Sequence, residues 1–99
     1  MTIEKAAIAG ALESGDCMVT VQPGNGKIEL ELESTVINQF GEQIRKVVMG
    51  TLRRLHVEDV FIRIVDKGAL DCTIKARVEC AVYRSIDKKW NLPWGDVIQ

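Results

Sequence analysis

The hydrophobic period changes along this chain, and that change constrains the fold more than any other feature of the sequence. Residues 28–33 alternate between Ile or Leu and Glu, which gives a strand with one apolar face and one charged face. Residues 17–21 alternate similarly, and the Pro-Gly-Asn-Gly segment at 23–26 can reverse the chain direction between them. We therefore predict a hairpin over residues 17–33.

The next segment, residues 35–55, has a helical period. Its apolar residues recur every three or four positions: Val36, Ile37, Phe40, Ile44, Val47, Val48, Leu52 and Leu55. This spacing places one apolar stripe along a long helix. Residues 57–65 then return to strand character, with apolar side chains on both faces, which is typical of an interior strand.

The segment 70–82 fits two periods. Seven apolar residues alternate from Leu70 to Val82, which predicts a fourth strand. Five apolar residues of the same segment also form a helical stripe, so a helix remains the alternative. Residues 83–99 show no period, and Pro93 disfavours regular structure there, so we expect an irregular tail that contains Trp90 and Trp94.

These elements predict an α+β fold of two layers. We expect one long helix packed on a four-stranded, mainly antiparallel sheet, in the order ββαββ, with an irregular C-terminal tail. The 99 residues are enough for a single domain, 1–99, in which residues 1–16 form a mobile N-terminal segment and residues 83–99 the tail.

Charge and cysteine content exclude several classes of protein. The 13 basic and 14 acidic residues give a net charge of −1, whereas a dedicated nucleic-acid-binding protein has a basic excess. No apolar run is long enough for a membrane span, and we expect neither a signal peptide nor a membrane partner. The three cysteines form no C-x-x-C pair, which favours a reducing, cytoplasmic location.

Few residues suggest catalysis or metal binding. His56 is the only histidine, and its position after the long helix favours a solvent-facing or capping role. Cys17, Cys72 and Cys80 fall on the apolar phase of the predicted strands, so we expect buried, inert thiols and no metal site. The glutamates at 29, 31 and 33 are expected to form a solvated strand face rather than a set of catalytic acids.

Ser14 is the most informative candidate. It lies in Glu13-Ser14-Gly15-Asp16, where Gly15 permits unusual backbone dihedrals and leaves room beside the hydroxyl. An ordinary turn serine explains this spacing, and so does a hydroxyl that another enzyme modifies. A hydrolase using Ser14 is disfavoured, because the sequence places no histidine near it.

Two motifs resemble one known family. Residues 9–16 (Ala-Gly-Ala-Leu-Glu-Ser-Gly-Asp) resemble the N-terminal motif of the citrate lyase acyl carrier protein, the gamma chain of that complex. Residues 66–72 (Asp-Lys-Gly-Ala-Leu-Asp-Cys) resemble its second motif, which residues 75–79 extend, and residues 92–94 (Leu-Pro-Trp) resemble its closing segment. Gly95 departs from the family, where an acidic residue is expected.

The resemblance implies a non-catalytic carrier subunit. In that family the serine corresponding to Ser14 holds a 2'-(5''-phosphoribosyl)-3'-dephospho-coenzyme A arm through a phosphodiester, and no other residue is implied as a cofactor, catalytic or metal site. The implied partners are the citrate lyase alpha chain, which exchanges acetyl for citryl on the arm, and the beta chain, which releases oxaloacetate. The enzyme that transfers the prosthetic group is a third implied partner.

Two alternatives remain open at this point. The carrier subunit of malonate decarboxylase uses the same type of arm. An unmodified protein-interaction module would instead use an exposed strand edge and the tryptophans of the tail.

Overall fold

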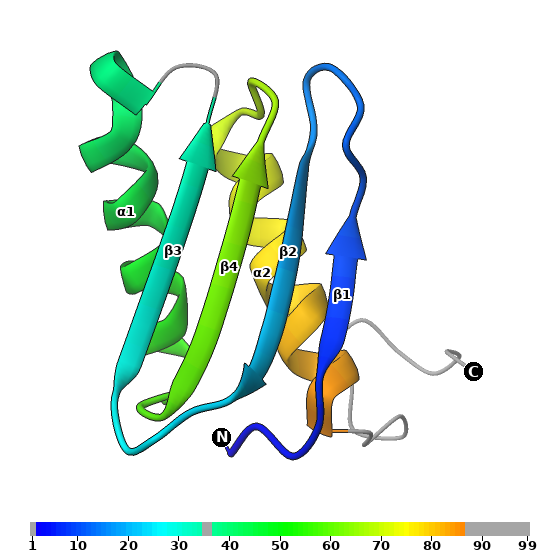
Figure 1. Cartoon of the computed structure of the whole chain (residues 1–99), viewed down its shortest axis with the longest axis vertical. Helices are drawn as coiled ribbons and strands as arrows, with labels where there is room; N and C mark the ends of the chain where they lie inside the picture. Colours follow the sequence, from blue (N-terminus) through cyan, green and yellow to red (C-terminus); the bar gives the residue numbers. More distant parts are fainter. Residues whose placement is uncertain (1, 35–36, 87–99) are drawn as a thin grey trace.

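The computed structural model describes residues 2–34 and 37–86, with the backbone alone for residues 37–40. Within these residues the chain forms the strands β1 (Ala7–Gly10), β2 (Cys17–Pro23), β3 (Ile28–Ser34) and β4 (Val60–Asp66). The two helices are α1 (Ile37–Arg54) and α2 (Asp71–Ile86). The α+β class and the two-layer arrangement, with a four-stranded sheet, are confirmed (Figure 1).

The strand order is β1-β2-β4-β3, so β4 lies inside the sheet as its apolar faces predicted. β4 pairs antiparallel with β2 and parallel with β3, while β1 pairs antiparallel with β2. The predicted hairpin over residues 17–33 is therefore wrong, because β4 separates its two strands. Alternation identified both strands correctly, but it carries no information about which strand pairs with which.

The predicted order ββαββ is also wrong in its last element. Residues 71–86 form α2, and the fourth strand is the short β1. The helical stripe determines the outcome because it supplies the buried face of α2: Ile74, Val78, Ala81, Val82, Ser85 and Ile86 are buried. Leu70 and Cys72, which belong to the competing alternating pattern, are exposed. The tail was predicted to begin at residue 83, but residues 83–86 are helical, and residues 87–99 lie outside the described part of the chain.

Both helices cover the same face of the sheet and share one core. α2 lies behind β1 and β2, and α1 lies alongside β3 (Figure 1). Val19, Ile62 and Ile64 from the sheet are fully buried together with Leu52 of α1 and Val78 of α2. An ion pair between Arg54 and Glu79 links the helices at their surface.

α1 ends in a capping turn at His56. The His56 amide donates to the Arg53 carbonyl at 3.0 Å, and the Val57 amide donates to the Leu52 carbonyl at 2.9 Å. His56 has a φ of 59°, the left-handed conformation that this pair of bonds requires. The expected solvent-facing or capping role of His56 is thus confirmed. Among the described helices, neither is long and apolar enough to cross a membrane.

Candidate functional site

Ser14 lies in the loop between β1 and β2, and it is exposed. The Asp16 amide donates to the Glu13 carbonyl at 3.0 Å, which closes a four-residue turn with Ser14 at its second position. Gly15, the third residue, has a φ of 83°, as a type II turn requires. A Cβ atom at Gly15 would meet nothing within 4 Å, so the space beside Ser14 is open. The turn therefore leaves Ser14 exposed, with open space at the neighbouring residue.

The same turn is joined to the end of β4 through Lys67. The Gly15 amide donates to the Lys67 carbonyl at 2.7 Å, and the Lys67 amide donates to the Asp16 carbonyl at 2.9 Å. Gly15 and Asp16 thus both face Lys67, and Gly15, the first of the two, has a left-handed backbone conformation. This arrangement is a G1 β-bulge. The bulge follows directly on the Cys17–Asp66 pair of the sheet. The main chain around Ser14 is consequently an extension of the sheet.

Arg77 of α2 fixes the turn from a second direction. Its guanidinium donates two hydrogen bonds of 3.0 Å to the two carboxylate oxygens of Asp16. The Asp16 carboxylate also accepts the Cys17 amide at 2.7 Å. The hydrogen bonds from Arg77, and then the one from Cys17, hold the pKa of Asp16 below its usual value of 3.8. Of the two carboxylates that flank Ser14 in the sequence, Asp16 is thereby paired within the chain, whereas Glu13 is exposed.

Lys67 and Arg77 are the residues of this site that sequence reasoning missed. Both lie in segments that stand out in the sequence only through their resemblance to the family. Arg77 is 61 residues from Asp16 in sequence, and no local pattern reveals an ion pair across that separation. The position of Ser14 was predicted ahead of the first strand, whereas the structure places β1 before it.

The structure does not bring Ser14 and His56 together. The Ser14 turn is bonded to Lys67, just after the last residue of β4, while His56 lies four residues before the first. Seven strand residues at about 3.3 Å each separate the two ends by roughly 20 Å. His56 is therefore too far from the Ser14 hydroxyl to act as its base.

The other candidate residues have structural or surface positions. Glu31 and Glu33 are exposed and form ion pairs with Arg63 at 3.7 and 3.1 Å, which confirms the solvated strand face for these two residues, whereas Glu29 is half-buried. Cys17 is buried as expected, but Cys72 is exposed and Cys80 is half-buried, so the prediction of three buried thiols is wrong. The described residues contain no group of acidic, histidine or cysteine side chains that could hold a metal ion.

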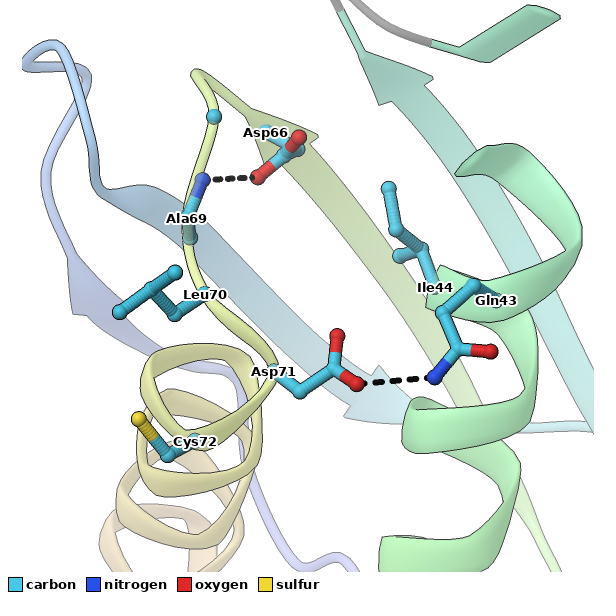
Figure 2. Close-up of a pocket in the computed structure, with 8 residues that line it drawn as sticks. Gln43, Ile44, Asp66, Ala69, Leu70, Asp71 and Cys72 are labelled. Carbon is cyan, nitrogen blue, oxygen red and sulfur yellow. Dashed lines mark hydrogen bonds between the residues drawn. The ribbon is translucent and has the colours of Figure 1, made fainter. Parts of the chain in front are cut away.

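A pocket of about 630 Å³ lies between α1 and the segment that joins β4 to α2. Gly68, Ala69 and Leu70 form one wall, and Gln43 and Ile44 of α1 project from the other (Figure 2). Asp66, Asp71 and Cys72 complete the lining that the structure describes. The Ala69 amide donates to the Asp66 carboxylate at 2.9 Å, and Gln43 donates to the Asp71 carboxylate at 2.8 Å across the pocket (Figure 2).

Residues 4–85 match the model of a family described as "ACP: Malonate decarboxylase delta subunit (MdcD)". The chain belongs to this family of acyl carrier proteins. It is 50% identical to a citrate lyase acyl carrier protein from Vibrio cholerae, over 98% of this chain and 99% of that one. It is 46% identical to a citrate lyase acyl carrier protein from Lacticaseibacillus casei, over 98% of this chain and 95% of the other. The resemblance found in the two sequence motifs is thus confirmed over nearly the whole chain.

A third relative agrees with membership in the carrier family, and one solved structure has a similar fold. A citrate lyase acyl carrier protein from Streptococcus mutans is 55% identical over 86% of this chain and 84% of its own length. A chain in the crystal structure of a Pseudomonas malonate decarboxylase hetero-tetramer in complex with malonate has a similar fold. The TM-score is 0.70 at 24% identity, over 85% of this chain and 87% of that one. This carrier protein is accordingly a non-catalytic subunit rather than an enzyme in its own right.

Proposed function

We propose that this protein is the acyl carrier subunit of a citrate lyase complex and that Ser14 is the attachment site of its prosthetic group. The group would be phosphoribosyl-dephospho-coenzyme A, joined to the Ser14 hydroxyl by a phosphodiester. The observation that carries this proposal is the exposed Ser14 on a turn that the Glu13–Asp16 hydrogen bond closes and that Gly15 joins to Lys67. The identity of 46–50% to citrate lyase acyl carrier proteins over nearly the full chain supports it.

The residues around Ser14 fit an anionic group. Arg77 neutralises Asp16 through two hydrogen bonds, which removes its repulsion of a phosphodiester, and Glu13 is exposed to water, which screens its charge. The bulge at Gly15 holds the main chain, so the attachment point is defined while the arm beyond it can move. Such a tether keeps the carried group at high effective concentration near successive partner sites.

The arm, when bound, would supply a thioester: the alpha chain would exchange acetyl for citryl on it, and the beta chain would cleave the citryl group to oxaloacetate and leave the acetyl thioester on the arm. The carrier holds and presents the arm in a reducing cytoplasm, where the exposed Cys72 thiol can persist. A malonate decarboxylase carrier is the second candidate, favoured by the description of the family model and by the fold of the Pseudomonas chain. The neighbouring genes distinguish the two, because they encode either citrate lyase chains or malonate decarboxylase chains.

Intact-mass measurement of the protein purified from citrate-fermenting cells tests the proposal. The wild-type chain should carry an addition of coenzyme size, and Ser14→Ala should abolish it. Thr20→Ala is the matched control, because Thr20 is a half-buried hydroxyl residue of β2 outside the turn, and it should retain the addition. An unmodified wild-type chain within an active complex would contradict the proposal and favour an interaction module.

A further inference from the structure

We propose that the pocket between α1 and the start of α2 is a resting site for the distal, thiol-bearing end of the arm. The inference rests on the proposed function of Ser14 and extends it, because it gives the carrier a binding site of its own for the group that it carries. The ligand class is a neutral pantetheine-like chain that ends in a free thiol or in a small uncharged acyl thioester.

The size and lining of the pocket suit such a chain. Its volume of about 630 Å³ falls within the roughly 300–1,000 Å³ range of pockets that hold small molecules. Ile44, Ala69 and Leu70 supply apolar surface, and Leu70 is 70% exposed, so a bound chain could cover it. Gln43 and Asp71 supply amide and carboxylate groups that can bond to the amides of a pantetheine chain.

The pocket and the attachment turn form one hydrogen-bonded unit. The Lys67 carbonyl accepts the Gly15 amide at 2.7 Å, and Gly68, the next residue, already lines the pocket. The loop of residues 67–69 is fixed to the sheet, because the buried Asp66 carboxylate accepts hydrogen bonds from the Ala69 amide and the Ser34 hydroxyl. An arm that starts at Ser14 therefore has only this short, fixed loop to cross.

Charge in the pocket selects which form of the arm can rest there. Asp66 and Asp71 line it, and the described lining contains neither a lysine nor an arginine. An arm that ends in a free thiol or an acetyl thioester brings no charge near these carboxylates. An acyl group that carries carboxylates is repelled, since like charges in a partly dry site interact strongly. The pocket would thus retain the arm between reactions and release it once a di- or tricarboxylate is loaded.

Protection of the arm thiol from alkylation is the decisive experiment. The modified protein, in a Cys72→Ser background that removes the rim thiol, is treated with iodoacetamide, and the arm is quantified by mass spectrometry. We expect the arm thiol to react about fivefold more slowly than free dephospho-coenzyme A, which corresponds to about 80% occupancy of the pocket. Leu70→Asp should restore the free rate. Ile8→Asp, at a residue of β1 that is 52% exposed and does not line the pocket, should not change it.

A second measurement uses the unmodified chain. Millimolar pantetheine should shift the backbone amide resonances of residues 68–72 and leave those of residues 28–33 unchanged. A chain that carries the arm on Ser14, reacts at the free rate and shows no such shifts would overturn the resting site while leaving the proposed function intact. A chain that never receives the arm but shows the shifts would contradict the proposed function instead.

Discussion

Arg77 donates two hydrogen bonds of 3.0 Å to Asp16, and this pair joins α2 to the turn that presents Ser14. The guanidinium side chain is 40% exposed and the carboxylate 18%, so the pair lies at the edge of the core. Bidentate geometry fixes orientation as well as distance. The structure thus ties the attachment turn to both layers of the fold, through Lys67 to the sheet and through Arg77 to the helices.

The Asp16–Arg77 pair predicts a specific acid sensitivity. The pKa of Asp16 is lower in the folded chain than its usual 3.8, so the pair stabilises the fold above that pH. This contribution is lost as the pH falls through the lowered pKa. Asp16→Asn should reduce the free energy of unfolding at pH 7, and its difference from wild type should shrink below pH 4. Urea denaturation across this pH range measures both effects.

Glu31→Gln is the control for that comparison. Glu31 forms an exposed ion pair with Arg63 at 3.7 Å, with the side chains 63% and 49% exposed. Exposed pairs contribute less than about 1 kcal/mol. An Asp16→Asn variant that behaves like Glu31→Gln at every pH would show that the bidentate pair has no structural role.

Gly15→Ala should strain the attachment turn without any collision. The open space around Gly15 accommodates a methyl group, but its φ of 83° costs an L-residue about 1–2 kcal/mol. Gly26→Ala is the matched variant, since Gly26 has a φ of 93° and equally open surroundings in the β2–β3 loop. Chemical denaturation should show a similar loss of unfolding free energy for both variants, whereas only Gly15→Ala should slow attachment of the arm.

Gly10 and Gly50 should respond to alanine in opposite directions. A Cβ at Gly10 would lie 1.9 Å from the Cys17 carbonyl oxygen, and its φ is 92°, so Gly10→Ala should cost more than about 3 kcal/mol. Gly50 lies in α1 with open space around it, so Gly50→Ala should stabilise the chain by about 0.5–1 kcal/mol. Thermal denaturation distinguishes them, and a stable Gly10→Ala variant would contradict the close approach of β1 to β2.

The cysteines should differ sharply in reactivity. Burial, reinforced by the charge of Asp16 and Asp66, raises the pKa of the Cys17 thiol to about 11, and Cys72 is exposed. Iodoacetamide at pH 8 should therefore modify Cys72 in the native protein and reach Cys17 only after unfolding. Peptide mapping by mass spectrometry checks the order, and early labelling of Cys17 would show that β2 opens readily.

The sequence allowed most elements to be located, but not their pairing. β2, β3, α1 and β4 each have a hydrophobic period that reflects local geometry. β1 was missed because Ala7–Gly10 is short and small-residue-rich, with no alternation to detect. The segment 70–82 satisfied two periods at once, and only packing against the sheet decides between them, since the helix buries Ile74 and Val78 while leaving Leu70 outside.

The functional site was likewise predictable only in its local part. Ser14 and the permissive backbone of Gly15 could be read from four consecutive residues, because a turn is a local structure. The bulge opposite Lys67, the ion pair to Arg77 and the pocket all join residues distant in sequence. Such features depend on the strand order, which the periodicity of individual segments does not determine.

The bulge at Gly15 has a consequence for synthesis of the protein. The Gly15 amide donates to the carbonyl oxygen of Lys67, and the Asp16 carboxylate accepts from the guanidinium of Arg77. A nascent chain that still lacks its second half can form the local Glu13–Asp16 bond, but it cannot anchor the Ser14 turn, because Lys67 and Arg77 have not yet been translated. An enzyme that recognises the anchored turn would therefore act as a check on folding, because it would modify only carriers whose two halves have already come together.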